Sequence, residues 1–159
     1  MSLIRRARPG DEAAIVAMVG ELAEFERAAD ECTVTEKQIS TALFGADPVG
    51  FCHIAEVDGE PAAIAVWFRN FSTWDGVAGI YLEDLFVRPA FRRRGLARAL
   101  LATLARECVD NGYSRLSWAV LDWNVNAIGL YDAVGGRQMS EWITYRVWGP
   151  ELSALAAES

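Results

Sequence analysis

One segment limits the possible folds of this chain more than any other. In residues 76–110, an apolar stretch runs into an arginine-rich loop and then into a helical pattern. Residues 76–87 predict a long strand that ends before Pro89. Residues 93–110 predict a helix whose apolar face consists of Leu96, Leu100, Leu101, Leu104 and Cys108. A helix N-terminus has unpaired N–H groups that attract phosphate oxygens, and Gly95 and Ala97 would let a bulky anion approach them. The loop therefore predicts either an anion site or a solvated basic surface.

The rest of the chain alternates between strand and helix patterns. The expected strands cover residues 2–7, 51–57, 62–68, 114–121 and 142–148, and the expected helices cover residues 11–27, 35–45 and 124–134. Asp11 stands where its side chain can cap the first helix, and Asp58-Gly59 is a typical hairpin turn. The central order of strand, helix, strand, helix, strand is that of an α/β sandwich. Because no repeat, low-complexity tract or linker interrupts the chain, we expect one domain over residues 1–159.

The positive charge of this acidic chain is concentrated in one place. The net charge is −7, yet eleven consecutive residues contain Arg88, Arg92, Arg93, Arg94 and Arg98. Such an asymmetry suits one small anion at the cluster and a cationic partner elsewhere, as in an enzyme with a phosphorylated cofactor and an amine substrate. The overall negative charge argues against a general nucleic-acid surface.

Other classes of protein are disfavoured by composition. No apolar run reaches the roughly 18 residues of a membrane helix, and Asp11 and Glu12 lie where a signal peptide needs apolar residues, so we expect a cytoplasmic protein. His53 is the only histidine, which leaves little for a His-based metal site or a Ser-His-Asp triad, and we expect no metal. The cysteines have no ligand-like spacing and predict free thiols at Cys32, Cys52 and Cys108.

Several stretches together resemble the GNAT superfamily of N-acetyltransferases. The loop Arg92-Arg93-Arg94-Gly95-Leu96-Ala97 fits the superfamily pattern Q/R-x-x-G-x-G/A. The spermidine/spermine (diamine) and thialysine N-acetyltransferase branch is matched by Tyr-Leu-Glu-Asp-Leu-Phe-Val at 81–87, Trp123-Asn124, Leu130-Tyr131, Glu-Leu-Ala-Glu-Phe-Glu at 21–26, and Thr-Glu-Lys at 35–37. The resemblance covers nearly the whole chain. It implies a mixed, mostly antiparallel α/β sheet flanked by helices and splayed between two central parallel strands.

The resemblance also implies the reaction and its donor. An acetyl group would pass from acetyl-CoA to a primary amine by direct attack, without a covalent acyl-enzyme, in a homodimer. The residues implied to bind acetyl-CoA are Leu85, Phe86, Val87, Arg93, Arg94, Gly95, Leu96, Ala97, Arg98, Asn124, Asn126 and Ala127. Backbone N–H groups near Phe86 would stabilise the oxyanion of the reaction.

Two residues stand at the family's catalytic positions. Glu83 is implied to accept the proton of the amine, directly or through water, and Tyr131 to protonate the departing thiolate. Strand alternation would turn Asp84 to the other face. Without the resemblance, Glu83 could be a surface charge and Tyr131 a core aromatic residue.

The implied acceptor site is acidic and aromatic, as suits a cation. Its residues would be Phe25, Glu26, Trp74, Asp75, Glu83, Ser117, Trp118, Ala119, Glu141 and Trp142. Phe25 stands where diamine enzymes usually have Tyr, and the loop before Trp142 is shorter than theirs. Glu26 could equally be an exposed charge at a helix end. A polyamine, lysine, a lysine analogue such as thialysine, or another small amine all remain open.

Two rival functions use the same fold. One is acetylation of a protein N-terminus or a lysine side chain, which amine and peptide substrates would distinguish. The other is a silent acyl-CoA-binding sensor, against which the presence of Glu83 and Tyr131 argues. A nucleic-acid contact of the arginine cluster is disfavoured by overall charge and by the lack of basic–aromatic interleaving.

Overall fold

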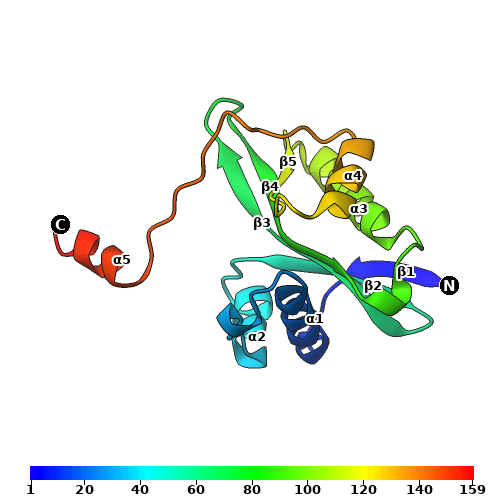
Figure 1. Cartoon of the computed structure of the whole chain (residues 1–159). Coiled ribbons are helices and arrows are strands. Elements are labelled where there is room, and N and C mark those ends of the chain that lie inside the picture. The colour runs from blue at the N-terminus through cyan, green and yellow to red at the C-terminus, as the bar shows by residue number, and fades with distance from the viewer. The chain divides into compact units, whose positions relative to one another are not determined.

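The computed structural model describes every residue from Met1 to Ser159. The chain forms two compact units, Met1–Val125 and Asn126–Ser159. Figure 1 shows the elements of both units. The expectation of a single domain stays a prediction.

The first unit is built on one five-stranded sheet whose strand order follows the sequence (Figure 1). The strands are β1 (Ser2–Arg6), β2 (Phe51–Val57), β3 (Glu60–Ser72), β4 (Val77–Val87) and β5 (Leu116–Trp118). The pairs from β1 to β4 are antiparallel, and β4 pairs with β5 in parallel. The expected class, a mixed and mostly antiparallel sheet with helices, is confirmed. The strand expected at 114–121 is much shorter than predicted.

Helices cover both faces of this sheet (Figure 1). On one face lie α1 (Glu12–Phe25) and α2 (Glu36–Phe44), and on the other lies α3 (Leu96–Asn111). Short 3-10 turns occur at η1 (Ala29–Glu31) and η2 (Pro89–Phe91). The predicted apolar face of the third helix is confirmed as buried, although α3 begins later than residue 93.

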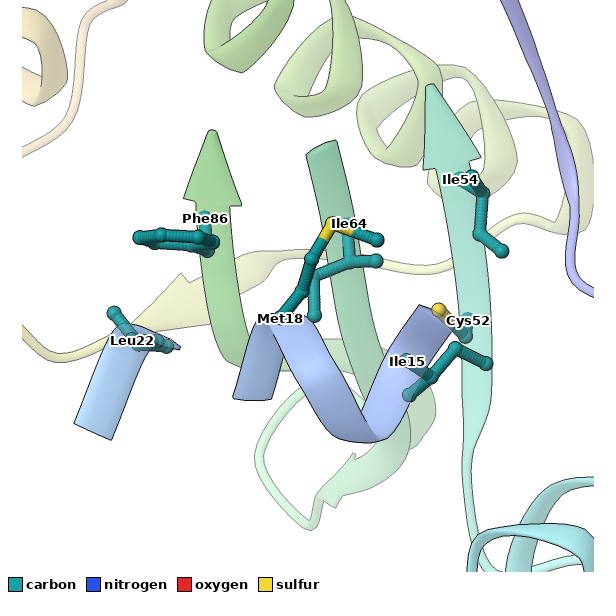
Figure 2. Close-up of a cluster of buried hydrophobic side chains, with 7 residues drawn as sticks. All are labelled: Ile15, Met18, Leu22, Cys52, Ile54, Ile64 and Phe86. Carbon is teal, nitrogen blue, oxygen red and sulfur yellow. The ribbon is translucent and has the colours of Figure 1, made fainter. Parts of the chain in front are cut away.

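A compact apolar cluster fixes α1 on strands β2, β3 and β4. Figure 2 shows its members, which are Ile15, Met18, Leu22, Cys52, Ile54, Ile64 and Phe86. Burying one large aliphatic side chain contributes about 1.5–3 kcal/mol, so this cluster is enough to hold the helix in register on the sheet. Phe86 therefore ties the strand that leads into the arginine-rich loop to the same core as α1.

The two helix starts on this face differ in how they are capped. Thr35 and Gln38 form a reciprocal capping box at the start of α2. Asp11 precedes α1 but makes no side-chain cap, so that prediction is wrong. Its carboxylate instead accepts hydrogen bonds from Arg5 on β1 at 2.8 and 3.0 Å, and from the Arg8 N–H. The ion pair with β1 takes the oxygens that a cap would need.

A β-bulge in β4 falls at the most informative point of the sequence. Trp67 of β3 lies opposite Leu82, and the next residue, Val66, lies opposite Asp84. Glu83 is thus an extra residue with no partner of its own on β3. A bulge of this kind bends the strand and interrupts the strict alternation of side chains. It also coincides with the end of pairing to β5, which reaches only from Ile80 to Leu82.

The second unit contains two short helices, α4 (Val125–Ala133) and α5 (Gly149–Ala156). Helix α4 begins at Val125, which is the last residue of the first unit. The strand expected at 142–148 is wrong, because these residues form neither strand nor helix and no strand register includes them. Alternating apolar residues favour a strand but do not supply its hydrogen-bonding neighbour. The parallel pair β4–β5 consequently lies at one end of the strand order rather than at its centre. None of the helices combines the length and apolar character needed to cross a membrane.

Candidate active site

The loop before α3 forms a cradle of backbone N–H groups. Arg93 and Gly95 both adopt the left-handed conformation, with φ of 63° and 76°. Alternation of left-handed and ordinary residues turns successive N–H groups toward one point, an arrangement that binds anions. Gly95 is the N-cap of the 16-residue helix α3, and no side chain caps this helix end. A Cβ built on Gly95 would meet no atom within 4 Å.

These features fit the pyrophosphate of acetyl-CoA. The helix start offers unpaired N–H groups, and the space beside Gly95 is open to an anion. The side chains of Arg93, Arg94 and Arg98 are exposed around it. Leu96 and Ala97 lie in the first turn, where only their backbone groups can take part because Leu96 is buried in the core.

The end of β4 presents backbone groups that no neighbouring strand pairs where β5 stops. The Arg88 N–H donates to the Ala62 carbonyl at 2.9 Å. Backbone groups two residues apart on an antiparallel strand point to the same neighbour. The backbone groups of Phe86 therefore also point toward β3, and those of Leu85 and Val87 point the other way. On that side the last paired residues are Leu82 and Trp118. The N–H of Phe86 therefore faces β3, and the N–H groups of Leu85 and Val87 face away from it, on the side where β5 has ended.

Two adjacent carboxylates sit at the bulge in different environments. Glu83 is exposed, whereas Asp84 is half-buried opposite Val66, on the face that packs against α1. Burial raises the pKa of Asp84 to about 6, and the negative charges of Glu83 and Glu26 add to the rise. The alternation by which we placed Asp84 does not apply across the bulge.

Asp84 was missed as a candidate by reasoning from the sequence. Its only signal was a pair of acidic residues inside an otherwise apolar strand. Glu26, which was predicted, follows the last residue of α1, and burial raises its pKa as well. The structure thus brings Glu26 close enough to Asp84 for the two charges to interact.

An open groove of about 430 Å³ lies beside these groups. It is lined by Glu21, Glu24, Phe25, Phe86, Pro89 and Arg92. The Arg92 guanidinium lies 5.3 Å from the ring centre of Phe25 and 5.9 Å from that of Phe86. Its Nε donates to the Val87 carbonyl at 3.1 Å, so this arginine links α1 to the end of β4. Glu21 and Glu24 of α1 contribute carboxylates to this groove, and Glu21 is paired with Arg88 at 3.0 Å.

Other predicted acceptor residues of the first unit lie in two places. Ser117 and Trp118 pair with Tyr81 and Leu82, and Ala119 follows them, so this group lies next to the bulge. Trp74 and Asp75 lie instead at the tip of the β3–β4 hairpin.

The hairpin tip is distant from the carboxylates within one chain. Trp74 is 88% exposed, and Asp75 pairs with Arg115 at 3.0 Å. Residues 77–83 of β4 separate the tip from Glu83 by roughly 20 Å at about 3.3 Å per residue. The structure therefore does not bring Trp74 and Asp75 together with the bulge.

The remaining predicted residues lie at the end of the first unit and in the second. Asn124 belongs to the first unit, where its N–H donates to the Leu121 carbonyl at 3.0 Å. The second unit holds Asn126, Ala127 and Tyr131 on α4, and Glu141 and Trp142 near a turn closed by the Trp142 N–H and the Met139 carbonyl. The roles of these residues stay predictions.

Comparison with known proteins gives the family and the fold of the chain. The model of the acetyltransferase (GNAT) family matches residues 17–135. The thialysine N-epsilon-acetyltransferase of Sus scrofa is 35% identical over 98% of each chain. The enzyme of that name from Caenorhabditis elegans is 40% identical over 91% of this chain and 90% of its own. An integron cassette protein from the mobile metagenome of V. cholerae has the same fold, with a TM-score of 0.77 at 24% identity over 98% of this chain and 97% of that one.

Proposed function

Because the chain belongs to the acetyltransferase (GNAT) family and is an acetyltransferase, we propose that it acetylates a primary amine of a small, cationic, lysine-like acceptor. The observation that carries this proposal is that β4 bears a carboxylate pair at its bulge and leads directly into the anion cradle at the start of α3. One end of the site suits the phosphates of a donor, and the other suits an ammonium group.

Acetyl-CoA would supply an activated thioester when bound. The cradle from Arg93 to Arg98 would hold its pyrophosphate, and the exposed arginines would add charge. The backbone groups of Leu85 and Val87 would bind the pantetheine arm and stabilise negative charge on the carbonyl oxygen. Asn124, Asn126 and Ala127 would complete the donor site.

The carboxylates at the bulge would receive the acceptor. With a pKa of about 6, Asp84 is mostly ionised at neutral pH, and together with Glu83 and Glu26 it would attract an ammonium group. Glu83, the more exposed of the pair, would take the proton of the amine, directly or through water. Tyr131 would give a proton to the departing thiolate.

A covalent acetyl-enzyme on Cys52 is disfavoured. Cys52 is buried in the core under α1, and burial raises the pKa of its thiol to about 12. Such a thiol is almost fully protonated at neutral pH and is a poor nucleophile. Direct attack by the amine is therefore the proposed route.

The similarity to two thialysine enzymes over nearly the whole chain favours an amino acid with a side-chain amine over a protein substrate. The acidic groove beside Phe25 is consistent with a second cationic group on the acceptor, so diamines are the next candidates. We further propose a cytoplasmic homodimer, as the family resemblance implies, which light scattering of the purified protein would test.

The test is an amine panel with purified protein and acetyl-CoA, read as release of free thiol. Thialysine and lysine should have the highest kcat/KM, cadaverine an intermediate one, and pentylamine and a lysine-containing peptide the lowest. Mass spectrometry should place the new acetyl group on the side-chain amine. Equal kcat/KM for cadaverine and pentylamine would remove the acidic recognition site. Preference for the peptide would replace the small acceptor with a protein.

A further inference from the structure

Five side chains of the first unit stack in series beside the proposed site. The Arg27 guanidinium lies 4.3 Å from the ring centre of Trp123. The Trp123 ring lies 5.9 Å from that of Phe25, at an interplanar angle of 48°. Arg92 follows on Phe25, and Phe86 follows on Arg92. We call these five residues the aromatic column.

The aromatic column connects the two sides of the gap between β4 and β5. Phe86 belongs to β4, and Arg92 lies in the loop that follows it. Trp123 comes from the segment that follows β5, beyond the point where the two strands stop pairing. Phe25, the last residue of α1, is the link between them. Stacked aromatic and cation–π contacts each contribute roughly 0.5–1.5 kcal/mol, so the series is strong enough to fix one helix end.

Its geometry is not that of ordinary core packing. Phe25 and Trp123 remain 40% and 38% exposed. Arg27 has a φ of 63° because it is the left-handed residue that ends α1: its N–H donates to the Glu24 carbonyl at 3.0 Å, and the Ala28 N–H donates to the Ala23 carbonyl at 2.8 Å. This helix end places the Arg27 guanidinium over Trp123. Neither Arg27 nor Arg92 is within ion-pair distance of a carboxylate, although Glu24 and Glu26 are close in sequence.

The residue held by the aromatic column is next to a proposed acceptor ligand. Phe25 directly precedes Glu26, whose N–H closes the last turn of α1 on the Leu22 carbonyl at 2.9 Å. Leu22, one turn before Glu26, packs in the same buried cluster as Phe86, which lies two residues beyond Asp84 on β4. The end of α1 that carries Glu26 therefore lies on the face of the sheet that carries Asp84, and the charge of Glu26 adds to the rise in the pKa of Asp84. A shift of Phe25 would therefore move one carboxylate relative to the other.

We propose that Trp123 is a positioning residue for the amine acceptor, which acts by holding Phe25 and the end of α1 so that Glu26 stays beside Asp84. Arg92 extends this support to the donor strand. The proposal rests on the proposed function and adds a residue that does not itself touch the reacting atoms.

The test compares Trp123→Leu, which removes the ring, with Trp123→Phe, which keeps one. At saturating acetyl-CoA, Trp123→Leu should raise the KM for thialysine about 5- to 20-fold, as the loss of one aromatic pair and one cation–π contact predicts. The kcat should change by less than about threefold, because the reacting groups stay in place. The Kd for CoA, measured by calorimetry, should stay within about twofold of the wild-type value, since the cradle is untouched. Trp123→Phe should restore the KM to within about threefold of wild type.

A matched control and a second measurement complete the experiment. Phe71→Leu removes an aromatic residue that is 66% exposed on β3 and outside the aromatic column, and it should leave the KM unchanged. Amide hydrogen exchange of residues 24–28 should accelerate about tenfold in Trp123→Leu and not in Trp123→Phe, because the end of α1 opens more often. An unchanged KM or unchanged exchange in Trp123→Leu would overturn the proposal, as would a general loss of CoA binding and thermal stability. Amide hydrogen exchange needs no substrate, so it tests the role of Trp123 separately from the proposed function. The proposed function fails if the wild-type protein acetylates no amine of the panel.

Discussion

The anion cradle makes its sharpest prediction at two glycines that bracket the same helix. Gly95 precedes α3 and Gly112 follows it, with φ of 76° and 70°. At both positions a Cβ would meet no atom within 4 Å. Replacement by alanine therefore imposes the same backbone strain twice without a steric clash. Only Gly95 borders the proposed phosphate site.

The expected loss of stability is the same for the two variants. An L-residue in the left-handed conformation costs roughly 1–2 kcal/mol, so Gly95→Ala and Gly112→Ala should each lower the free energy of unfolding by about 1 kcal/mol. For a chain of this length, that corresponds to a fall in Tm of about 2–4 °C per kcal/mol. Thermal melting without ligand should therefore give two similar values below wild type.

The expected loss of donor affinity is different. In Gly95→Ala the new methyl group enters the open space where the pyrophosphate would lie, and it should displace one hydrogen bond to a charged group. Each such bond is worth about 1.5–3 kcal/mol, so the Kd for acetyl-CoA should rise by about 10- to 100-fold. Gly112→Ala should bind acetyl-CoA like wild type. Titration calorimetry on the folded variants measures both, and equal Kd values for the two would refute the cradle as the phosphate site.

Three further predictions concern single groups. Tyr131→Phe should lower kcat by roughly 10²- to 10⁴-fold with little change in acetyl-CoA affinity if its hydroxyl is the acid, and near-normal turnover would make it a packing residue. Asp84 has a folded pKa of about 6, above its unfolded value, so its ionisation destabilises the fold as pH rises from about 4 to 6. Asp84→Asn should therefore raise the free energy of unfolding by about 2 kcal/mol at pH 8 and hardly at all at pH 4, while activity on thialysine falls. Urea titrations measure the free energy of unfolding, and equal effects of the substitution at both pH values would contradict the raised pKa. Burial and the charge of Arg6 lower the pKa of His53, whose Nδ1 accepts a hydrogen bond from Trp67. The unfolded chain therefore gains this proton first, and the free energy of unfolding should fall as pH drops below about 6.5. His53→Gln should flatten that part of the plot of unfolding free energy against pH.

Features set by neighbouring residues could be predicted from the sequence. The Asp58-Gly59 turn has positive φ at both positions, as its sequence predicts for a tight hairpin. The apolar period of residues 93–110 identified the buried face of α3. The loop at the start of that helix was also identified as a possible anion site, and its positive φ at Gly95 fits that role, which stays a prediction. In each case the determining interactions are only a few residues long.

Features set by distant residues could not be predicted. Whether Asp11 caps a helix depends on Arg5, which reaches its carboxylate from another element. Whether residues 142–148 form a strand depends on a neighbour that no local pattern supplies. The bulge at Glu83 appears only when β4 is aligned with β3, and with it the burial of Asp84. Trp123 could be recognised as part of a family motif, but its contact with Phe25 joins segments almost a hundred residues apart.

The way this fold distributes its arginines is what leaves the carboxylates available. Three arginines lie near the groove, and none of them forms an ion pair with Glu26, Glu83 or Asp84. Arg88 is bound by Glu21 at 3.0 Å and by the Pro61 carbonyl, while Arg27 and Arg92 lie on aromatic rings. No ion pair of the chain includes Asp84, so the charge that burial disfavours is not relieved from within. Keeping an unpaired carboxylate half-buried lowers stability above pH 6, and a fold under no functional constraint would have paired or replaced it. Under the proposed function, the ammonium group of the acceptor would be the cation that Asp84 receives, so the binding of a cationic acceptor should lower the pKa of Asp84.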